Sequence, residues 1–314
     1  MSKLSNIWVF SDIASRLPEI IAAGVALGEK VSAFVIGTEA DINRAYSFGA
    51  THVYCLGDKD SQKITEDYNN TIAKVISSST DTNTLMLLAA NKRCKALASK
   101  LGVQLQAGVV NDVTEINIDN GICAKHMAYG GLAIAEEKIN SPIAIMTLSS
   151  GVFEAQVANT NNTGEAVNVA FVEPKTPIKC IERRAKQGES VDLGKAKRVI
   201  GVGSGIGSKD NLQVASELSA IIGAELGCSR PIAETEKWMD RERYIGVSGV
   251  MLKPEIYLAL GISGQIQHMV GALGSQTIFA VNKDKNAPIF QYVDYGIVGD
   301  INKVMPALIN AFKA

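Results

Sequence analysis

The sequence predicts an α/β protein with two doubly wound parallel-sheet domains. Apolar strand-like runs alternate with helix-like segments through the first half, and the same alternation begins again at Arg198. The length of 314 residues exceeds one ordinary hydrophobic core, so two domains of roughly 120 to 190 residues are expected. A polar stretch that includes Gly188 and Gly194 sets the predicted boundary, so the domains cover residues 1–188 and 189–314.

The first half is predicted to alternate strands and helices. Expected strands cover residues 7–10, 31–36, 52–56, 84–90 and 141–148, and expected helices cover residues 17–27, 39–48, 65–78 and 91–101. The run TLMLLAA in the fourth strand is continuously apolar, which is typical of a parallel strand buried on both faces. Asp119-Asn120-Gly121 predicts a hairpin turn, so an antiparallel extension is expected after Asn111. Residues 167–172 are expected to form an edge strand.

The second half is predicted to form a smaller sheet of the same kind. A strand from Arg198 enters a glycine-rich turn. Further strands are expected at residues 225–228 and 256–260, and two more end at Asn282 and Gly299. Helices are expected at residues 211–222, after Gly264 (a short one) and at residues 301–312.

Composition excludes several functional classes. A net charge of −1, with 46% hydrophobic and 20% charged residues, indicates a globular protein without attraction to nucleic acid. Five cysteines without a CxxC pair and three histidines predict neither a disulfide framework nor a metal site. No signal peptide and no apolar stretch of roughly 20 residues is evident, so we expect a cytoplasmic protein without membrane insertion.

Polar and glycine residues follow several strands of the second sheet. Residues 261–268 (GISGQIQH) follow one strand, and Asn282, Asp284 and Asp300 follow the next two. Because ligands bind at the carboxyl ends of parallel strands, these residues predict a dinucleotide site that holds phosphates and hydroxyls. The helix after Gly264 is expected to receive phosphate at its N-terminus. His268 is either a hydrogen-bond donor to a cofactor carbonyl or a histidine satisfied within the core.

Two further turns have alternative interpretations. Gly201 to Gly205 either cradles a phosphate or is a tight turn without a ligand, since Ile206 replaces the third glycine of GxGxxG. With Glu225 as the acidic ribose ligand, this turn would indicate a nicotinamide-dependent oxidoreductase, and an adenine-nucleotide-binding regulatory module is a third hypothesis. Arg230 suits a phosphate or an anionic ring, or is a surface arginine. Without GxSxG, HExxH or Walker A, no catalytic residue is predicted.

The runs GISGQIQHMVG and AVNKDKNAPIFQYVDYGIVGD resemble the FAD-binding signature of electron-transfer flavoprotein α subunits. GVGSGIGS, CSRP and RYIGVSG extend the resemblance across the second domain, and IWVFSD and YGGLAIAEEKINSP extend it to the whole chain. CSRPIAETEKWM is similar to the FixB-type branch, which is associated with anaerobic carnitine (crotonobetaine) reduction.

The resemblance implies that the second domain is a Rossmann-like FAD-binding domain and that the first contacts a separate β subunit. It implies an electron carrier without substrate turnover of its own, which passes electrons to an acyl-CoA-dehydrogenase-like partner or a reductase. The residues expected to contact FAD are Ser204, Ser229, Arg230, Ile245, Gly246, Val247, Ser248, Ser263, Gly264, Gln265, Ile266, Gln267, His268, Asn282, Asp284 and Asp300.

The resemblance also implies individual roles. Ser248 matches a hydroxyl near flavin N5, and Arg230 matches an arginine that stabilises the anionic semiquinone. His268 would lie near the carbonyl on the pyrimidine side of the flavin. The sequence departs from the family pattern twice, since Ser204 replaces an arginine of the glycine-rich turn and Val247 replaces a glutamine. One cationic FAD contact is therefore missing, and the hydrogen bonding around the ring is expected to differ.

Overall fold

The computed structural model describes residues 3–59, 62–79, 84–183 and 193–313. The chain divides into two compact units, one of residues 1–127 and 134–186 and the other of residues 128–133 and 187–314. Each unit contains a sheet that is mainly or entirely parallel, as the sequence predicts. The predicted domain boundary at 188/189 lies outside the described residues. No helix within the described ranges is both long and apolar enough to cross a bilayer.

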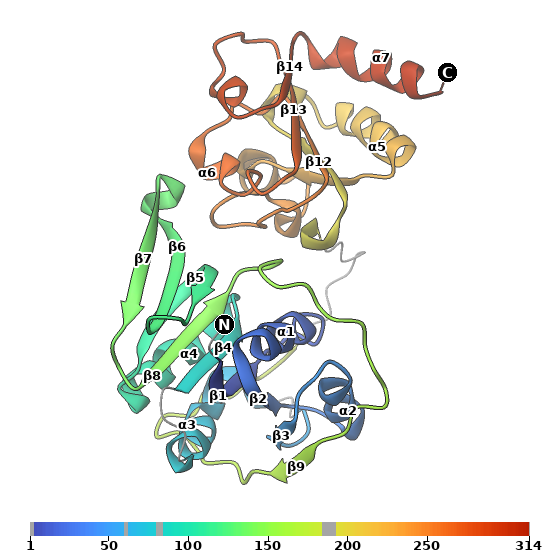
Figure 1. Cartoon of the computed structure of the whole chain (residues 1–314). Coiled ribbons are helices and arrows are strands. Elements are labelled where there is room, and N and C mark those ends of the chain that lie inside the picture. The colour runs from blue at the N-terminus through green and yellow to red at the C-terminus, as the bar shows by residue number, and fades with distance from the viewer. Residues whose placement is uncertain (1–2, 60–61, 80–83, 184–192, 314) are drawn as a thin grey trace. The chain divides into compact units, whose positions relative to one another are not determined.

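The first unit is built on a nine-stranded sheet with strand order β7-β6-β5-β8-β4-β1-β2-β3-β9 (Figure 1). Its strands are β1 (Leu4–Phe10), β2 (Gly28–Val35), β3 (His52–Cys55), β4 (Thr84–Ala89), β5 (Gly108–Asn117), β6 (Ile122–Ala128), β7 (Ala133–Ile139), β8 (Ile143–Leu148) and β9 (Glu165–Asn168). Its helices are α1 (Leu17–Leu27), α2 (Glu39–Ser47), the 3₁₀ turn η1 (Thr65–Tyr68), α3 (Asn69–Ser78) and α4 (Lys92–Leu105).

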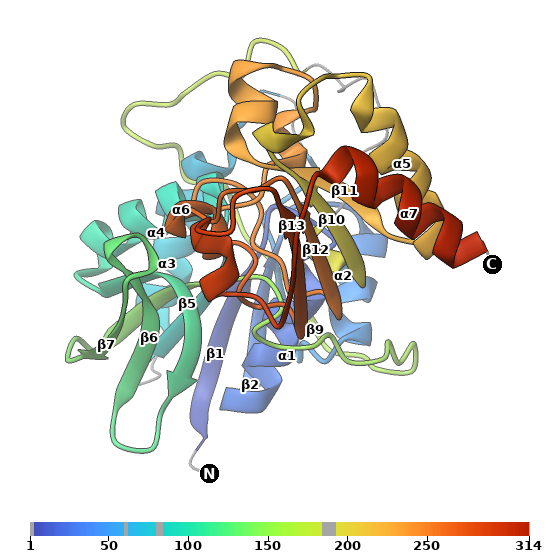
Figure 2. The same ribbon diagram turned by 90° about the horizontal axis from the view of Figure 1, so that it is seen from above.

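The predicted antiparallel extension is present. Strands β5 and β6 pair antiparallel on either side of the turn at Asp119, whereas β5 pairs parallel with β8. Figures 1 and 2 show β6 and β7 running side by side as a long ribbon. Strand β9 lies at the sheet edge beside β3, near the predicted position. The expected helix at residues 65–78 begins with the tighter turn η1, a common way for a helix to begin.

The core of the first unit surrounds its central strands. All six residues of β4 are buried, which explains its continuously apolar sequence. On neighbouring strands, the rings of Trp8, Phe34 and Tyr54 form a cluster with centroid separations of 5.0–5.5 Å. Aromatic rings in such contacts stabilise the sheet through the apolar area that they bury.

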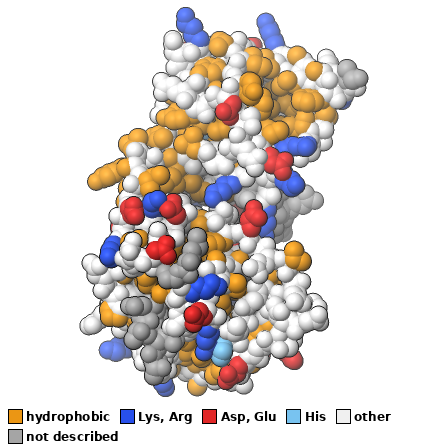
Figure 3. Space-filling model, in the orientation of Figure 1, with side chains coloured by type: hydrophobic (Ala, Val, Ile, Leu, Met, Phe, Trp, Pro, Cys, Tyr) orange, Lys and Arg blue, Asp and Glu red, His pale blue; other side chains and the backbone are white. Residues whose placement is uncertain are grey.

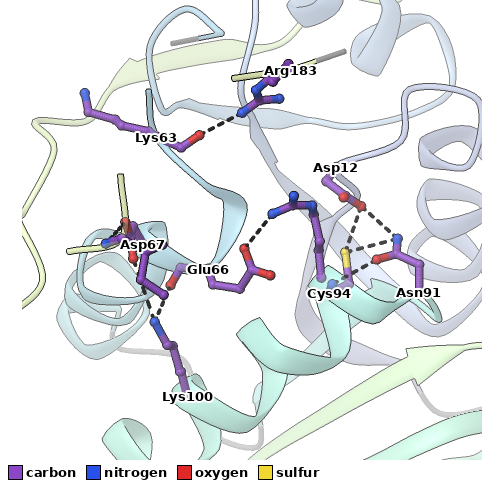
Figure 4. A network of polar contacts seen from close by, with 10 residues as sticks. Asp12, Lys63, Glu66, Asp67, Asn91, Cys94, Lys100 and Arg183 are labelled. Carbon is purple, nitrogen blue, oxygen red and sulfur yellow. Dashed lines mark hydrogen bonds and ion pairs between the residues drawn. The ribbon is translucent and has the colours of Figure 1, made fainter. Parts of the chain in front are cut away.

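In the first sheet, the strand order reverses between β4 and β1, and side chains contact each other directly at that point. The carboxyl ends of β1 and β4 lie next to each other there, at Asp12 and Asn91. Asn91 Nδ2 donates to Asp12 Oδ1 at 2.7 Å, and Cys94 Sγ donates to the same oxygen at 3.3 Å (Figure 4). Burial raises the pKa of the Cys94 thiol to about 12, so it stays protonated. Direct side-chain contacts therefore occupy this position of the first sheet.

The second unit is built on a five-stranded sheet with strand order β11-β10-β12-β13-β14, and all four pairings are parallel. Its strands are β10 (Arg198–Val202), β11 (Glu225–Cys228), β12 (Ile256–Leu260), β13 (Thr277–Asn282) and β14 (Tyr295–Val298). Its helices are α5 (Asn211–Ile222), α6 (Ile266–Met269) and α7 (Ile301–Lys313), with short turns η3 (Leu193–Lys195), η4 (Ser204–Ile206), η5 (Pro231–Thr235), η6 (Arg241–Arg243) and η7 (Pro288–Gln291).

The two faces of this sheet are covered differently. Helices α5 and α7 lie side by side over one face (Figures 1 and 2), where Ile200 and Val202 of β10 are buried. Val199 is buried on the opposite face with Tyr257 of β12, against α6 and the loops around it. The alternation of neighbouring β10 residues between two cores explains why the strand is apolar throughout. The face without long helices carries the irregular chain that surrounds the site.

Candidate functional site

The strand order of the second sheet reverses between β10 and β12. From β10 the chain passes through α5 to β11 on one side, and β12 then pairs with β10 on the other side. In open α/β sheets, the loops that leave two such strands diverge and leave a crevice at the carboxyl ends, where ligands bind.

A cavity of about 660 Å³ occupies this position. Its size lies within the range of small-molecule and cofactor pockets. It is lined by the residues that follow β10, β11, β12 and β13, together with the loop around Ser248, namely Gly203, Ser204, Gly205, Ser229, Arg230, Pro231, Tyr244, Val247, Ser248, Gly261, Ile262, Ser263, Gln265, Gln267, His268 and Asn282. Four strand ends thus converge on one site, which is the convergence that the sequence predicts.

Glycines form the close contact between the loops after β10 and β12. A side chain at Gly203 would collide with the carbonyl oxygen of Gly261, and one at Gly205 would lie 2.7 Å from Gly261 Cα. Gly261 itself has a φ of +64°, which favours glycine. Gly205 N donates to Gly261 O at 3.0 Å, so this amide is not free for a phosphate. The glycine-rich turn therefore positions the crevice main chain, and Gly201 lies inside β10.

Ten of the predicted FAD contacts line the cavity and six do not. The residues that line it are Ser204, Ser229, Arg230, Val247, Ser248, Ser263, Gln265, Gln267, His268 and Asn282. Ile245, Gly246, Gly264, Ile266, Asp284 and Asp300 are not among its lining residues. The Asp284 and Asp300 carboxylates accept hydrogen bonds from the backbone amides two residues later, so they shape their own turns.

The helix after Gly264 is shorter than its expected role requires. Helix α6 has only four residues, so few peptide dipoles align at its N-terminus. A phosphate at this helix N-terminus would therefore gain little electrostatic stabilisation from the helix dipole. Ser263, Gln265 and Gln267, at alternate positions around the start of α6, are exposed.

Arg230 is the one charged side chain among the lining residues, within the part of the chain that the structure describes. Its side chain is 66% exposed, and its Nε donates to Glu234 Oε2 at 2.6 Å. Arg241 Nη2 lies 3.3 Å from the other oxygen of Glu234. The hydrogen bond from Arg230 lowers the pKa of the Glu234 carboxyl, with Arg241 acting in the same direction. Two cations therefore share one anion, and the group keeps a net positive charge.

Two buried polar atoms of the cavity wall lack hydrogen bonds within the described residues: Ser229 Oγ and His268 Nδ1. The other nitrogen of His268, Nε2, lies 2.7 Å from the hydroxyl of Tyr257. Burial lowers the pKa of His268 to about 4, so the imidazole is neutral near pH 7. His268 is thus partly a core histidine, since its Nε2 is already satisfied.

The remaining polar lining residues differ in how free they are. Ser248 is exposed, and its Oγ lies 3.4 Å from the Tyr244 hydroxyl, a long contact that leaves it available to a ligand. Asn282 Nδ2 donates to the Ile262 carbonyl at 2.9 Å, and its Oδ1 accepts from the Asp284 amide. Asn282 therefore ties two strand-end loops together as well as lining the cavity.

Glu225 lies away from this cavity. It begins β11, whereas Ser229 at the carboxyl end of the same strand lines the site. Its Oε2 is 4.0 Å from Arg243 Nη1, beside a separate groove near Trp238. The acidic ribose ligand that the nicotinamide hypothesis requires is therefore at the wrong end of the strand.

Sequence reasoning missed several lining residues. Pro231, Tyr244 and Ile262 line the cavity without being among the predicted FAD contacts, as do the glycines at 203, 205 and 261. The glycines and Ile262 stand in turns that the sequence singles out, so their signal was present. Tyr244 carries no signal of its own because an aromatic residue near a strand end usually packs in the core.

A parallel sheet whose reversal point opens into a cavity with glycine-lined loops defines a dinucleotide-binding α/β protein. Residues 192–273 match the family described as the electron transfer flavoprotein FAD-binding domain, and residues 18–174 match the electron transfer flavoprotein domain. The chain belongs to the electron transfer flavoprotein α-subunit family.

Individual relatives align over almost the whole chain. Protein FixB of Salmonella typhimurium (strain LT2) is 53% identical over 312 residues, which cover 99% of both proteins. Protein FixB of Salmonella typhi has the same identity and coverage, and Protein FixB of Escherichia coli O157:H7 is 52% identical over 312 residues.

The residues present fit FAD. Within the described residues the enclosed Ser229 Oγ and His268 Nδ1 have no hydrogen-bond partner, and the glycine-lined crevice leaves room that side chains would fill. Arg230 adds a positive charge beside this wall, as a phosphate or an electron-rich ring requires. Ser204, where the resemblance implies an arginine, lies in the same wall without adding a second charge.

Proposed function

We propose that this chain is the FAD-carrying α subunit of a heterodimeric electron-transfer flavoprotein and works without substrate turnover of its own. The observation that carries the proposal is the cavity at the reversal point of the second sheet, lined by ten of the residues expected to contact FAD. Membership of the α-subunit family supports a β subunit as partner. Bound FAD supplies reversible one- and two-electron transfer.

The residues of the cavity have complementary roles in this proposal. Arg230 places positive charge where negative charge develops on the ring during reduction. Ser248 offers an exposed hydroxyl that can donate to a ring nitrogen. His268 contributes a neutral imidazole and closes the inner wall, which keeps water from this side of the ring.

The physiological role proposed here is electron delivery to an acyl-CoA-dehydrogenase-like partner or reductase in anaerobic carnitine (crotonobetaine) reduction. Its support is resemblance to the FixB-type branch, including the segment CSRPIAETEKWM. A cytoplasmic location is part of the same proposal. On the face that Figure 3 shows, acidic and basic side chains are interspersed, which differs from the single-charge surface typical of a nucleic-acid-binding protein.

The test is co-expression with an electron-transfer flavoprotein β subunit, followed by FAD addition, gel filtration and stepwise anaerobic reduction. We expect stoichiometric flavin in the heterodimer fraction and reduction in two resolved one-electron steps. An Arg230→Ala variant should lower the first reduction potential, whereas Arg198→Ala, at the opposite end of β10 from the cavity, serves as the matched control. A folded heterodimer that takes up no FAD would overturn the proposal and favour the adenine-nucleotide module.

A further inference from the structure

Tyr257 lies directly behind the cavity wall. It is fully buried in β12, and its hydroxyl lies 2.7 Å from Nε2 of His268, whose ring lines the cavity. The space for this hydroxyl exists because Gly201, on the adjacent strand β10, has no side chain, and a Cβ there would collide with the hydroxyl oxygen. Tyr257 itself is not among the residues that line the cavity.

The direction of the hydrogen bond follows from the surroundings. Burial raises the pKa of Tyr257, so the phenol keeps its proton, and within the described residues His268 Nε2 is its hydrogen-bond partner. If Nε2–H donated instead, the buried phenol proton would have no acceptor. An unsatisfied buried donor disfavours that arrangement roughly tenfold or more.

The opposite nitrogen does not reverse this preference. Nδ1 is enclosed and has no hydrogen-bond partner within the described residues. With the proton on Nδ1, one buried polar group is unsatisfied, whereas with the proton on Nε2 the phenol proton and the Nδ1 lone pair are both unsatisfied. The contact with Tyr257 therefore decides the tautomer.

We propose that Tyr257 is a positioning residue for the flavin site: its hydroxyl donates to Nε2 of His268 and fixes the imidazole as the neutral tautomer protonated on Nδ1. The imidazole is then uncharged, so within the described residues Arg230 is the one charged side chain of the cavity wall. The orientation of the ring is also fixed before any ligand arrives. The relevance of this contact to flavin rests on the proposed function, whereas the tautomer itself does not.

The tautomer can be measured directly in the full chain with its β subunit, before FAD is added. This chain has three histidines, so ¹⁵N-histidine labelling of this chain, combined with an unlabelled β subunit, gives a simple spectrum, and loss of one pair of signals in His268→Gln assigns it. In the wild-type protein we expect one His268 nitrogen with the shift of a protonated atom, assigned to Nδ1, and one with the shift of a bare atom. Finding Nε2 protonated, or both nitrogens protonated at pH 7, would overturn the proposal.

The matched pair of variants is Tyr257→Phe and Tyr46→Phe. Tyr46 is a buried tyrosine of the first unit whose hydroxyl has no hydrogen bond within the described residues. Tyr257→Phe should replace the single tautomer by averaged shifts of both nitrogens, and Tyr46→Phe should leave them unchanged. In the FAD-loaded protein, the first reduction potential should shift in Tyr257→Phe alone.

The outcomes separate this inference from the proposed function. Averaged shifts in the flavin-free variant support the role of Tyr257 even if FAD fails to bind, which would count against the proposed function only. Unchanged His268 shifts in Tyr257→Phe would refute the positioning role, whether or not the protein binds FAD. A flavin potential that moves equally in both variants would also refute it, because the effect would then be unspecific.

Discussion

Acidification should destabilise the second unit through His268. The folded-state pKa of this residue is about 4, below the ordinary value of 6.5, because burial disfavours the charged imidazole. Between these two values the unfolded chain binds a proton that the folded chain does not, so stability is greatest above pH 6.5 and falls as the pH falls toward 4. From pH 7 to pH 4.5, the free energy of unfolding should decrease by about 2 kcal/mol from this residue.

The assay is urea denaturation at several pH values, followed by the fluorescence of Trp238 in the second unit. The chain has two tryptophans, so a Trp8→Phe background removes the signal of the first unit. His268→Gln is neutral at every pH and serves as the comparison. Other titrating groups contribute alike to both proteins and cancel in the difference. Identical pH slopes for the two proteins between pH 6.5 and 4.5 would refute the reasoning.

Three further predictions concern the cavity and its supports. Gly201→Ala should lower the free energy of unfolding of the second unit by about 1–3 kcal/mol, because its methyl group would overlap the hydroxyl of Tyr257; a neutral effect in denaturation would contradict the packing described. Gly264→Ala should lower the free energy of unfolding of the second unit by about 1–3 kcal/mol, because φ is +85° and the new Cβ would collide with the main chain of η7. A variant with unchanged stability and unchanged FAD retention would contradict this packing. Glu234→Gln should raise the flavin reduction potential by freeing Arg230, and potentiometry showing a fall would disprove that charge balance.

Much of the fold follows from local sequence pattern. Helix α1 and strand β11 have the predicted bounds, because the apolar spacing of one and the short apolar run of the other are read locally. The parallel class follows from the alternation of strands and helices. The end of α6 at Met269 does not, because the apolar residue Val270 continues the pattern beyond it.

The site was predictable to a similar degree. Glycines and polar residues at strand ends mark where a ligand binds, and Ser248 and Asn282 follow from that rule with the family resemblance. The partners of Arg230 and His268 were not predicted. The pair of Arg230 and Glu234 has the i, i+4 spacing that a sequence can suggest. The contact between Tyr257 and His268 exists only once β12 and the loop after it are folded.

The inner edge of the cavity is made of main chain where Gly203 and Gly205 meet Gly261. This part of the surface has no side-chain rotamers, so a ligand that binds there fixes none of them and loses no affinity to side-chain entropy. The same surface cannot adapt its shape to a different ligand by repacking. Selectivity among related cofactors therefore has to come from the rim, where serines, glutamines and Arg230 supply the side chains.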